Sequence, residues 1–296
     1  MKAFSKILVP VDFSKHADAA IDTAIEMASH SDASITLLNV VEPVALVFPD
    51  DPSFYPGPIV ADMMEELRKA LEKKKEAALE KGAKRVSIEQ SLGYPAAAIK
   101  EVAEGGGYDL IVMGTLGRTG LAHFFLGSVA ERVVRTASCA VLTVHEGCKP
   151  FSKILVPTDF SAGSDAALDA AIDLAVRRQA SITLVNVYQP IGYAFPTGSG
   201  IYTSLPLDHV IRDQLEALDK LQQGALAKGA KQVEIAPRTG HPPTEIRDLA
   251  RAGGFDLIVM GTHGRSGMSH MLIGSVAERV VRTAPCPVLT IREARA

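Results

Sequence analysis

The sequence lacks the features that would assign it to several classes of protein. Its three cysteines, Cys139, Cys148 and Cys286, show no C-x-x-C spacing, which excludes a disulfide framework and a zinc knuckle and fits a reducing cytoplasm. It has no basic excess, since 31 Lys and Arg face 34 Asp and Glu for a net charge of -3. Binding to nucleic acid or to a membrane surface through a positive field is therefore not expected, and small ligands or protein partners are.

Long apolar runs are also missing, and no segment reaches the length that spans a membrane. The opening stretch "MKAFSKILVPVDF" passes directly from two lysines into a short strand-like run, without the cleavage region of a signal peptide. We therefore expect a cytoplasmic protein.

What the sequence does contain is an internal repeat. The segment "DLIVMGT" begins at Asp109 and returns at Asp256, and "SKILVP" and the Asp-Phe-Ser that follows it return at the same offset of 147. A length of 296 residues suits two domains of ordinary size. The repeat predicts one domain over residues 1–147 and a second over 148–296.

Within each half, strand-like and helix-like segments alternate. "KILVPVDF" is a continuous run of branched apolar residues, typical of a parallel strand covered on both faces. Ser14 suits a helix N-cap, and residues 61–81 have the pattern of an amphipathic helix that ends at Gly82. Five strands alternating with four helices predict an α/β fold, with two tandem doubly wound (Rossmann-like) domains and a parallel strand order of 3-2-1-4-5.

Such a sheet binds ligands beyond the carboxyl ends of its first and fourth strands, where the strand order reverses. In the first half these strands end at Asp12 and Gly114, and a helix is expected to begin at Ser128. A helix N-terminus presents unpaired N–H groups that suit a phosphate, and glycine permits both close approach and positive φ. Ser128 would either donate to a phosphate or cap the helix, since Glu131 completes a capping box.

An aspartate at the same crevice has a different role, because a carboxylate repels phosphate groups. Asp12 and its repeat Asp159 would instead accept hydrogen bonds from a ribose or from an adenine amino group. The alternative is that each simply closes the turn between a strand and a helix.

The spacing Gly114-x2-Gly117-x9-Gly127-Ser128, repeated at Gly261, resembles the ATP-binding signature of universal stress proteins, as do "KILVPVDFS", "SITLLNVVEP" and "CPVLTI". The resemblance covers almost the whole chain. It implies a tandem cytoplasmic stress protein that binds ATP, or AMP or ADP. Magnesium could accompany ATP, because the phosphates would supply most of its ligands.

The resemblance also implies a set of binding residues in each half. In the first half they are Asp12, Val41, Gly114, Gly117, Gly127 and Ser128, with Val41 at the adenine pocket. In the second half they are Asp159, Tyr188, Gly261, Gly264, Gly274 and Ser275. The ring of Tyr188 would either stack on adenine or crowd it, so the two sites need not bind alike.

Three functions remain open on the sequence. There is no G-x-x-x-x-G-K-[ST], G-x-S-x-G or H-E-x-x-H motif, which favours a nucleotide-dependent stress-response or signalling module over an enzyme. A slow ATPase or adenylyl-transfer activity is the alternative, and a scaffold with vestigial pockets is the third.

Neither a metal site nor a defined oligomer follows from the sequence. The spacing of His123, His263 and His270 matches no ligand framework, and His263 is expected to be an exposed loop residue. The family resemblance implies that the final strands, "AVLTV" and "PVLTI", pair the two halves as a pseudo-dimer. A homodimer of the tandem chain is compatible with the sequence.

Overall fold

The computed structural model describes residues 4–42, 57–115, 126–148, 150–189, 207–264 and 273–292. The chain divides into two compact units, with the change from one to the other between Pro150 and Phe151. No helix in these described segments has both the length and the apolar character needed to cross a bilayer.

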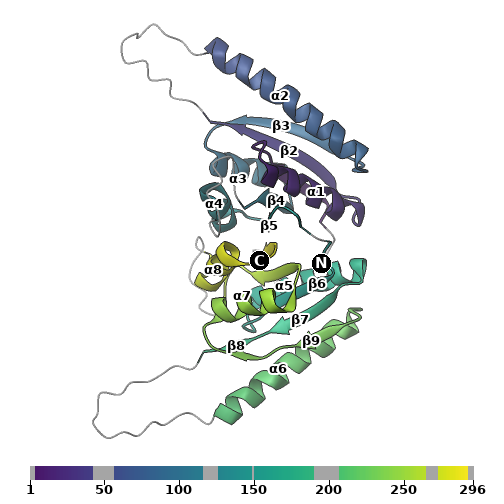
Figure 1. Cartoon of the computed structure of the whole chain (residues 1–296), viewed down its shortest axis with the longest axis vertical. Helices are drawn as coiled ribbons and strands as arrows, with labels where there is room; N and C mark the ends of the chain where they lie inside the picture. Colours follow the sequence, from purple (N-terminus) through teal and green to yellow (C-terminus); the bar gives the residue numbers. More distant parts are fainter. Residues whose placement is uncertain are drawn as a thin grey trace, which may run out of the picture. The chain divides into compact units, whose positions relative to one another are not determined.

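The N-terminal unit alternates strands and helices as the sequence predicts (Figure 1). Its elements are β1 (Lys6–Pro10), α1 (Lys15–Ser29), β2 (Ser34–Val41), α2 (Gly57–Glu80), β3 (Val86–Leu92), α3 (Pro95–Gly106), β4 (Leu110–Gly114), α4 (Ser128–Thr136) and β5 (Ala140–Val144). Helix α2 begins four residues before the predicted position, and Gly82 follows its end at a φ of 100°.

The C-terminal unit repeats this order with two strands interrupted. Its elements are β6 (Lys153–Pro157), α5 (Ala162–Arg178), β7 (Ser181–Val185), β8 (Val187–Tyr188), α6 (Leu207–Ala227), β9 (Val233–Ile235), β10 (Arg238–Thr239), α7 (Pro242–Gly253), β11 (Leu257–Gly261), α8 (Ser275–Thr283) and β12 (Val288–Ile291).

The strand order confirms the doubly wound α/β class in both units. It is β3-β2-β1-β4-β5 in the first and β9-β7-β6-β11-β12 in the second, and every pair within a unit is parallel. In the N-terminal unit, α1 contacts α2 and α3 contacts α4, as expected when right-handed crossovers place one pair on each face of the sheet (Figure 1). Strands β1 and β4 are therefore neighbours, with Ile7 opposite Leu110.

The central strands are the core of each unit, which explains their unbroken apolar sequences. Residues Ile7, Leu8 and Val9 of β1 are fully buried, and so are Ile154, Leu155 and Val156 of β6. A strand covered by helices on both faces has no solvent side to alternate with, so it reads as a continuous apolar run.

The C-terminal unit keeps the predicted five parallel strands, but two of them are interrupted. Its sheet does not run as five uninterrupted strands, because β8 and β10 form a separate two-stranded ladder after a break at Asn186. Pro237 stands in the corresponding break between β9 and β10, where the N-terminal unit has Gln90. Proline lacks an N–H and is tolerated at sheet edges, which is where these strands lie.

At the amino ends of the strands, an aspartate ties β4 to β1. The Asp109 carboxylate accepts hydrogen bonds from the Ser5 N–H (2.7 Å), the Ser5 hydroxyl (2.7 Å) and the Lys6 N–H (3.0 Å). Asp256 holds Ser152 and Lys153 in the same way. These contacts fix the pair of strands whose other ends form the predicted crevice.

Candidate functional site

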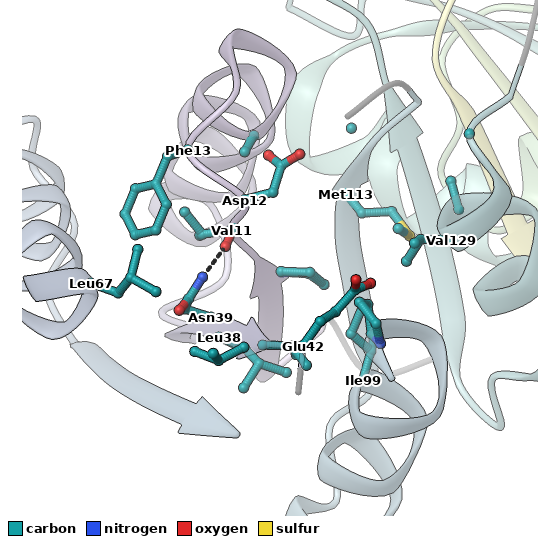
Figure 2. A pocket seen from close by; sticks show the side chains of 18 of the residues that line it. Val11, Asp12, Phe13, Leu38, Asn39, Glu42, Leu67, Ile99, Met113 and Val129 are labelled. Carbon is teal, nitrogen blue, oxygen red and sulfur yellow. Dashed lines mark hydrogen bonds between the residues drawn. The ribbon is translucent and has the colours of Figure 1, made fainter. Parts of the chain in front are cut away.

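A cavity of about 510 Å³ lies at the carboxyl ends of β1, β2 and β4 in the N-terminal unit (Figure 2). Its walls also include residues of α2, α3 and the first turn of α4. Gly117 is outside the described residues. The other predicted binding residues of this half all line the cavity, namely Asp12, Val41, Gly114, Gly127 and Ser128.

The turn from β1 to α1 places Asp12 at this cavity. Its carboxylate accepts a hydrogen bond from the Ser14 N–H at 3.0 Å, and Ser14 in turn caps α1 by accepting from the Ala17 N–H at 3.2 Å. Between them, Phe13 has a positive φ of 65°, which is uncommon for a residue with a side chain. Asp12 thus closes the turn, as the alternative interpretation expects, and lines the cavity as well.

The first turn of α4 does not have the predicted cap. Gly127 is the N-cap, with a φ of -61°, so Ser128 occupies the first helical position and its capping-box interpretation is wrong. Glu131 pairs instead with Arg135 at 2.7 Å. The cause is tertiary, because the Gly127 N–H donates to the Thr115 carbonyl at 2.7 Å and starts the helix one residue earlier than the local pattern suggests.

This geometry leaves three backbone donors at the cavity. Ser128, Val129 and Ala130 are the first three helical residues, whose N–H groups have no acceptor within an α-helix. None of the three N–H groups bonds to another part of the described chain, and all three residues line the cavity. The Ser128 side chain is exposed there.

The glycines at the ends of β4 and β11 have a packing role that the sequence interpretation missed. A Cβ added to Gly114 would lie 2.7 Å from the His16 Cβ and 2.9 Å from its carbonyl carbon, on the first turn of α1. A Cβ on Gly261 would meet the Gly163 carbonyl oxygen at 2.7 Å. Positive φ is not needed at any described glycine of the two signatures, so that part of the expectation is wrong.

In the C-terminal unit, the loop after β11 lies close to Asp159. A Cβ on Gly264 would lie 2.5 Å from Oδ2 of Asp159, so a side chain here would require the carboxylate to move. Oδ1 of Asp159 accepts from both the N–H (3.1 Å) and the hydroxyl (2.6 Å) of Ser161. Gly274 caps α8 with Ser275 exposed at the first helical position, and Tyr188 is half-buried at the end of β8.

Sequence reasoning missed Asn39, a polar side chain of β2 at the cavity wall. It is only 5% exposed, and its Nδ2 donates to the Val11 carbonyl at 2.9 Å, the contact drawn as a dashed line in Figure 2. The sequence did contain a signal for this residue, because an asparagine late in an apolar strand is repeated as Asn186 at the offset of 147. The apolar wall was missed as well, and it includes Leu67, Ile99 and Met113.

One histidine in each unit lies close to a threonine hydroxyl at the end of the fourth strand. Nδ1 of His145 lies 3.1 Å from the Thr115 hydroxyl, and burial, with repulsion from His16 second, lowers the pKa of His145. His263 is half-buried with Nδ1 2.9 Å from the Thr262 hydroxyl, so its expected exposure is wrong. His123 and His270 lie outside the described residues, among which no cluster of three or more His, Cys, Asp or Glu suits a metal ion.

The fold and the cavity together define a tandem doubly wound α/β protein with a cleft at the switch point of its N-terminal sheet. Both halves, residues 3–145 and 150–292, match the model of the universal stress protein family. The chain belongs to the universal stress protein family.

Individual relatives agree with this assignment. A universal stress protein of Mycolicibacterium smegmatis is 27% identical over 292 residues, which cover 97% of this chain and 96% of the relative. Another from Methanocaldococcus jannaschii is 41% identical over 153 residues, or 51% of this chain and 87% of the relative. The crystal structure of a universal stress protein from Archaeoglobus fulgidus shares the fold, with a TM-score of 0.75, 22% identity and coverage of 97% and 98%.

Proposed function

We propose that the chain binds an adenine nucleotide in the cavity of its N-terminal unit and serves as a nucleotide-dependent stress-response or signalling module. The phosphates would lie at the first turn of α4, the ribose at Asp12 and the adenine near Val41. The observation that carries this proposal is the set of three unpaired amide groups of α4 facing the same cavity as Asp12.

The amide groups of Ser128, Val129 and Ala130 support an anionic ligand. They stand at the positive end of the helix dipole, and the cap residue Gly127 has no side chain to occupy them. Anions are favoured at such a position by both charge and hydrogen bonding.

The remaining walls of the cavity support a nucleoside. Leu67, Ile99 and Met113 offer an apolar surface suited to a flat base, while Asp12 offers a carboxylate to ribose hydroxyls. The volume of about 510 Å³ falls within the range of roughly 300–1,000 Å³ common for small-molecule sites.

Ser128→Glu tests the proposal, because it separates ligand binding from folding. A glutamate in the first turn of a helix favours the helix by about 0.3–1 kcal/mol, yet it places a negative charge where the phosphates would bind. We expect unchanged or higher thermal stability and at least about tenfold weaker ATP binding, since like charges at about 4 Å repel by about 1 kcal/mol even in water and by more in a cleft.

Isothermal titration of the full chain with ATP, ADP and AMP, with and without Mg²⁺, measures the effect. Ser275→Glu is the matched control, since it makes the same change at α8 and leaves the N-terminal cavity intact. Wild-type protein that takes up no adenine nucleotide would refute the proposal, and so would Ser128→Glu with wild-type affinity. Phosphate release measured in the same samples distinguishes a binding module from an ATPase.

A further inference from the structure

The Asn39 side chain at the cavity wall has an unsatisfied hydrogen-bond acceptor. Its Oδ1 is buried and has no hydrogen-bond partner among the described residues, and the residue as a whole is only 5% exposed. Buried acceptors are rarely left unpaired, because the cost of removing them from water is then not recovered.

The orientation of this amide is fixed by its neighbour. The Val11 carbonyl lies 2.9 Å from Nδ2 and can only accept, so the amino group of Asn39 must face it. Oδ1 therefore points to the other side, where Figure 2 shows it directed towards Leu67 of α2. Rotating the amide by half a turn would leave two acceptors facing each other.

The C-terminal unit contains the same asparagine with its acceptor satisfied. Nδ2 of Asn186 donates to the Thr158 carbonyl at 2.6 Å, as in the first unit. Its Oδ1 accepts from Nε2 of Gln214 at 2.5 Å, and the same Nε2 lies 3.1 Å from the Asn186 carbonyl. Gln214 is 147 residues after Leu67, so it is the α6 counterpart of that leucine.

The repeat thus offers a comparison within one chain. A glutamine on the helix completes the asparagine in one unit, and a leucine of the cavity wall leaves it incomplete in the other. Leu67 is half-buried rather than locked in the core, so its side chain can turn aside. A donor that enters the cavity beside it can then reach Oδ1 of Asn39.

We propose that Asn39 selects the ligand of the N-terminal cavity by accepting a hydrogen bond from an N–H group, such as the 6-amino group of adenine, and that Gln214 removes this means of selection from the C-terminal unit. The inference rests on the proposed function and adds a specificity residue to it. A base with an oxygen at this position, as in inosine, presents a second acceptor to Oδ1 and is disfavoured.

The test compares ATP with inosine triphosphate by isothermal titration in a Ser275→Glu background, so that heat reports on the N-terminal cavity. We expect a preference of at least about tenfold for ATP, the size of one lost hydrogen bond to a buried group. Leu67→Gln copies the C-terminal unit, and it should raise the melting temperature of the free protein and reduce the preference for ATP about tenfold. Leu67→Met, of similar size but without a donor, should keep the preference.

The outcomes separate this inference from the proposed function. ATP binding with no preference over inosine triphosphate would overturn the inference and leave the proposed function standing. A folded Leu67→Gln protein that still prefers ATP as strongly as the wild type would also overturn the inference and leave the proposed function standing. No binding of either nucleotide by the wild-type chain would overturn both, and a new preference for ATP at the second site in Ser128→Glu/Gln214→Leu would support the inference independently.

Discussion

Substituting Gly114 by alanine decides whether this glycine serves packing or a ligand. The added Cβ would lie 2.7 Å from the His16 Cβ, 2.9 Å from its carbonyl carbon and 3.0 Å from its carbonyl oxygen. Two of these atoms belong to the backbone of α1, so the neighbour cannot relieve the clash by rotating a side chain. Either the helix or the strand has to shift.

The expected destabilisation follows from two opposing effects. Overpacking of this kind costs about 1–3 kcal/mol. The alanine also restricts the unfolded chain, which returns about 0.4–1 kcal/mol wherever the native backbone suits it. The net loss is on the order of 1–2 kcal/mol, and a domain of this size loses about 2–4 °C in melting temperature for each kcal/mol.

If Gly114 serves only a ligand, the expected change in the stability of the free protein has the opposite sign. If Gly114 were needed only for the approach of a phosphate, Gly114→Ala would stabilise the free protein by about 0.4–1 kcal/mol through the unfolded chain and would weaken nucleotide binding. Thermal and urea unfolding followed by far-ultraviolet circular dichroism, without nucleotide, therefore distinguishes the two roles. A melting temperature at or above that of the wild type would refute the packing argument.

Gly105→Ala is the matched control in the same unit. Gly105 is an exposed residue near the end of α3, and a Cβ there would meet no atom within 4 Å. Alanine in a helix is favoured over glycine by up to about 1 kcal/mol, so this variant should be as stable as the wild type or more so. A loss of stability in both variants would indicate a general sensitivity to substitution.

Three further predictions concern stability. Ser14→Ala should cost about 0.5–2 kcal/mol in urea unfolding by removing the acceptor of the Ala17 N–H, and unchanged stability would mean that the cap is not formed. Asp109→Ala should destabilise the chain by about 1–3 kcal/mol, since three donors lose their acceptor, but leave nucleotide affinity unchanged because it lies at the opposite end of the strands. Burial, and secondly repulsion from His16, lower the folded-state pKa of His145 below 6.5. The unfolded chain therefore binds this proton more tightly, and the stability of the fold should fall as the pH drops through about 6.5. His145→Gln should flatten this pH dependence, and an unaltered slope would contradict it.

Much of the fold was predictable because the pattern of each element occurs twice in the repeated sequence. Buried parallel strands read as apolar runs, and the order of strands and helices fixes where the first and fourth strands end. The sequence alone therefore predicts that Asp12 and Gly114 lie at one crevice. The interruption at Asn186 could not, since it depends on how an edge strand containing Pro237 meets its neighbour.

The start of α4 shows why local patterns fail at a site. Ser128 followed by Glu131 satisfies every sequence criterion for a capping box, yet the cap is Gly127. The hydrogen bond from the Gly127 N–H to the Thr115 carbonyl joins two ends of a loop, and no local pattern reports it. The same tertiary contact leaves the Ser128 hydroxyl exposed at the cavity instead of using it as a cap.

The turn after the first strand of each unit has a strained backbone that is a feature of the fold and not of a ligand site. Phe13 and Phe160 both have positive φ, at 65° and 62°, a conformation that costs on the order of 1–3 kcal/mol in a residue other than glycine. The strain occurs in both units, and in both the aspartate beside the phenylalanine accepts a hydrogen bond from the N–H of the following serine. It is therefore a property of the strand-to-helix turn itself and not evidence for a ligand, which rests instead on the unpaired amide groups of α4 and the unpaired acceptor of Asn39 at one cavity.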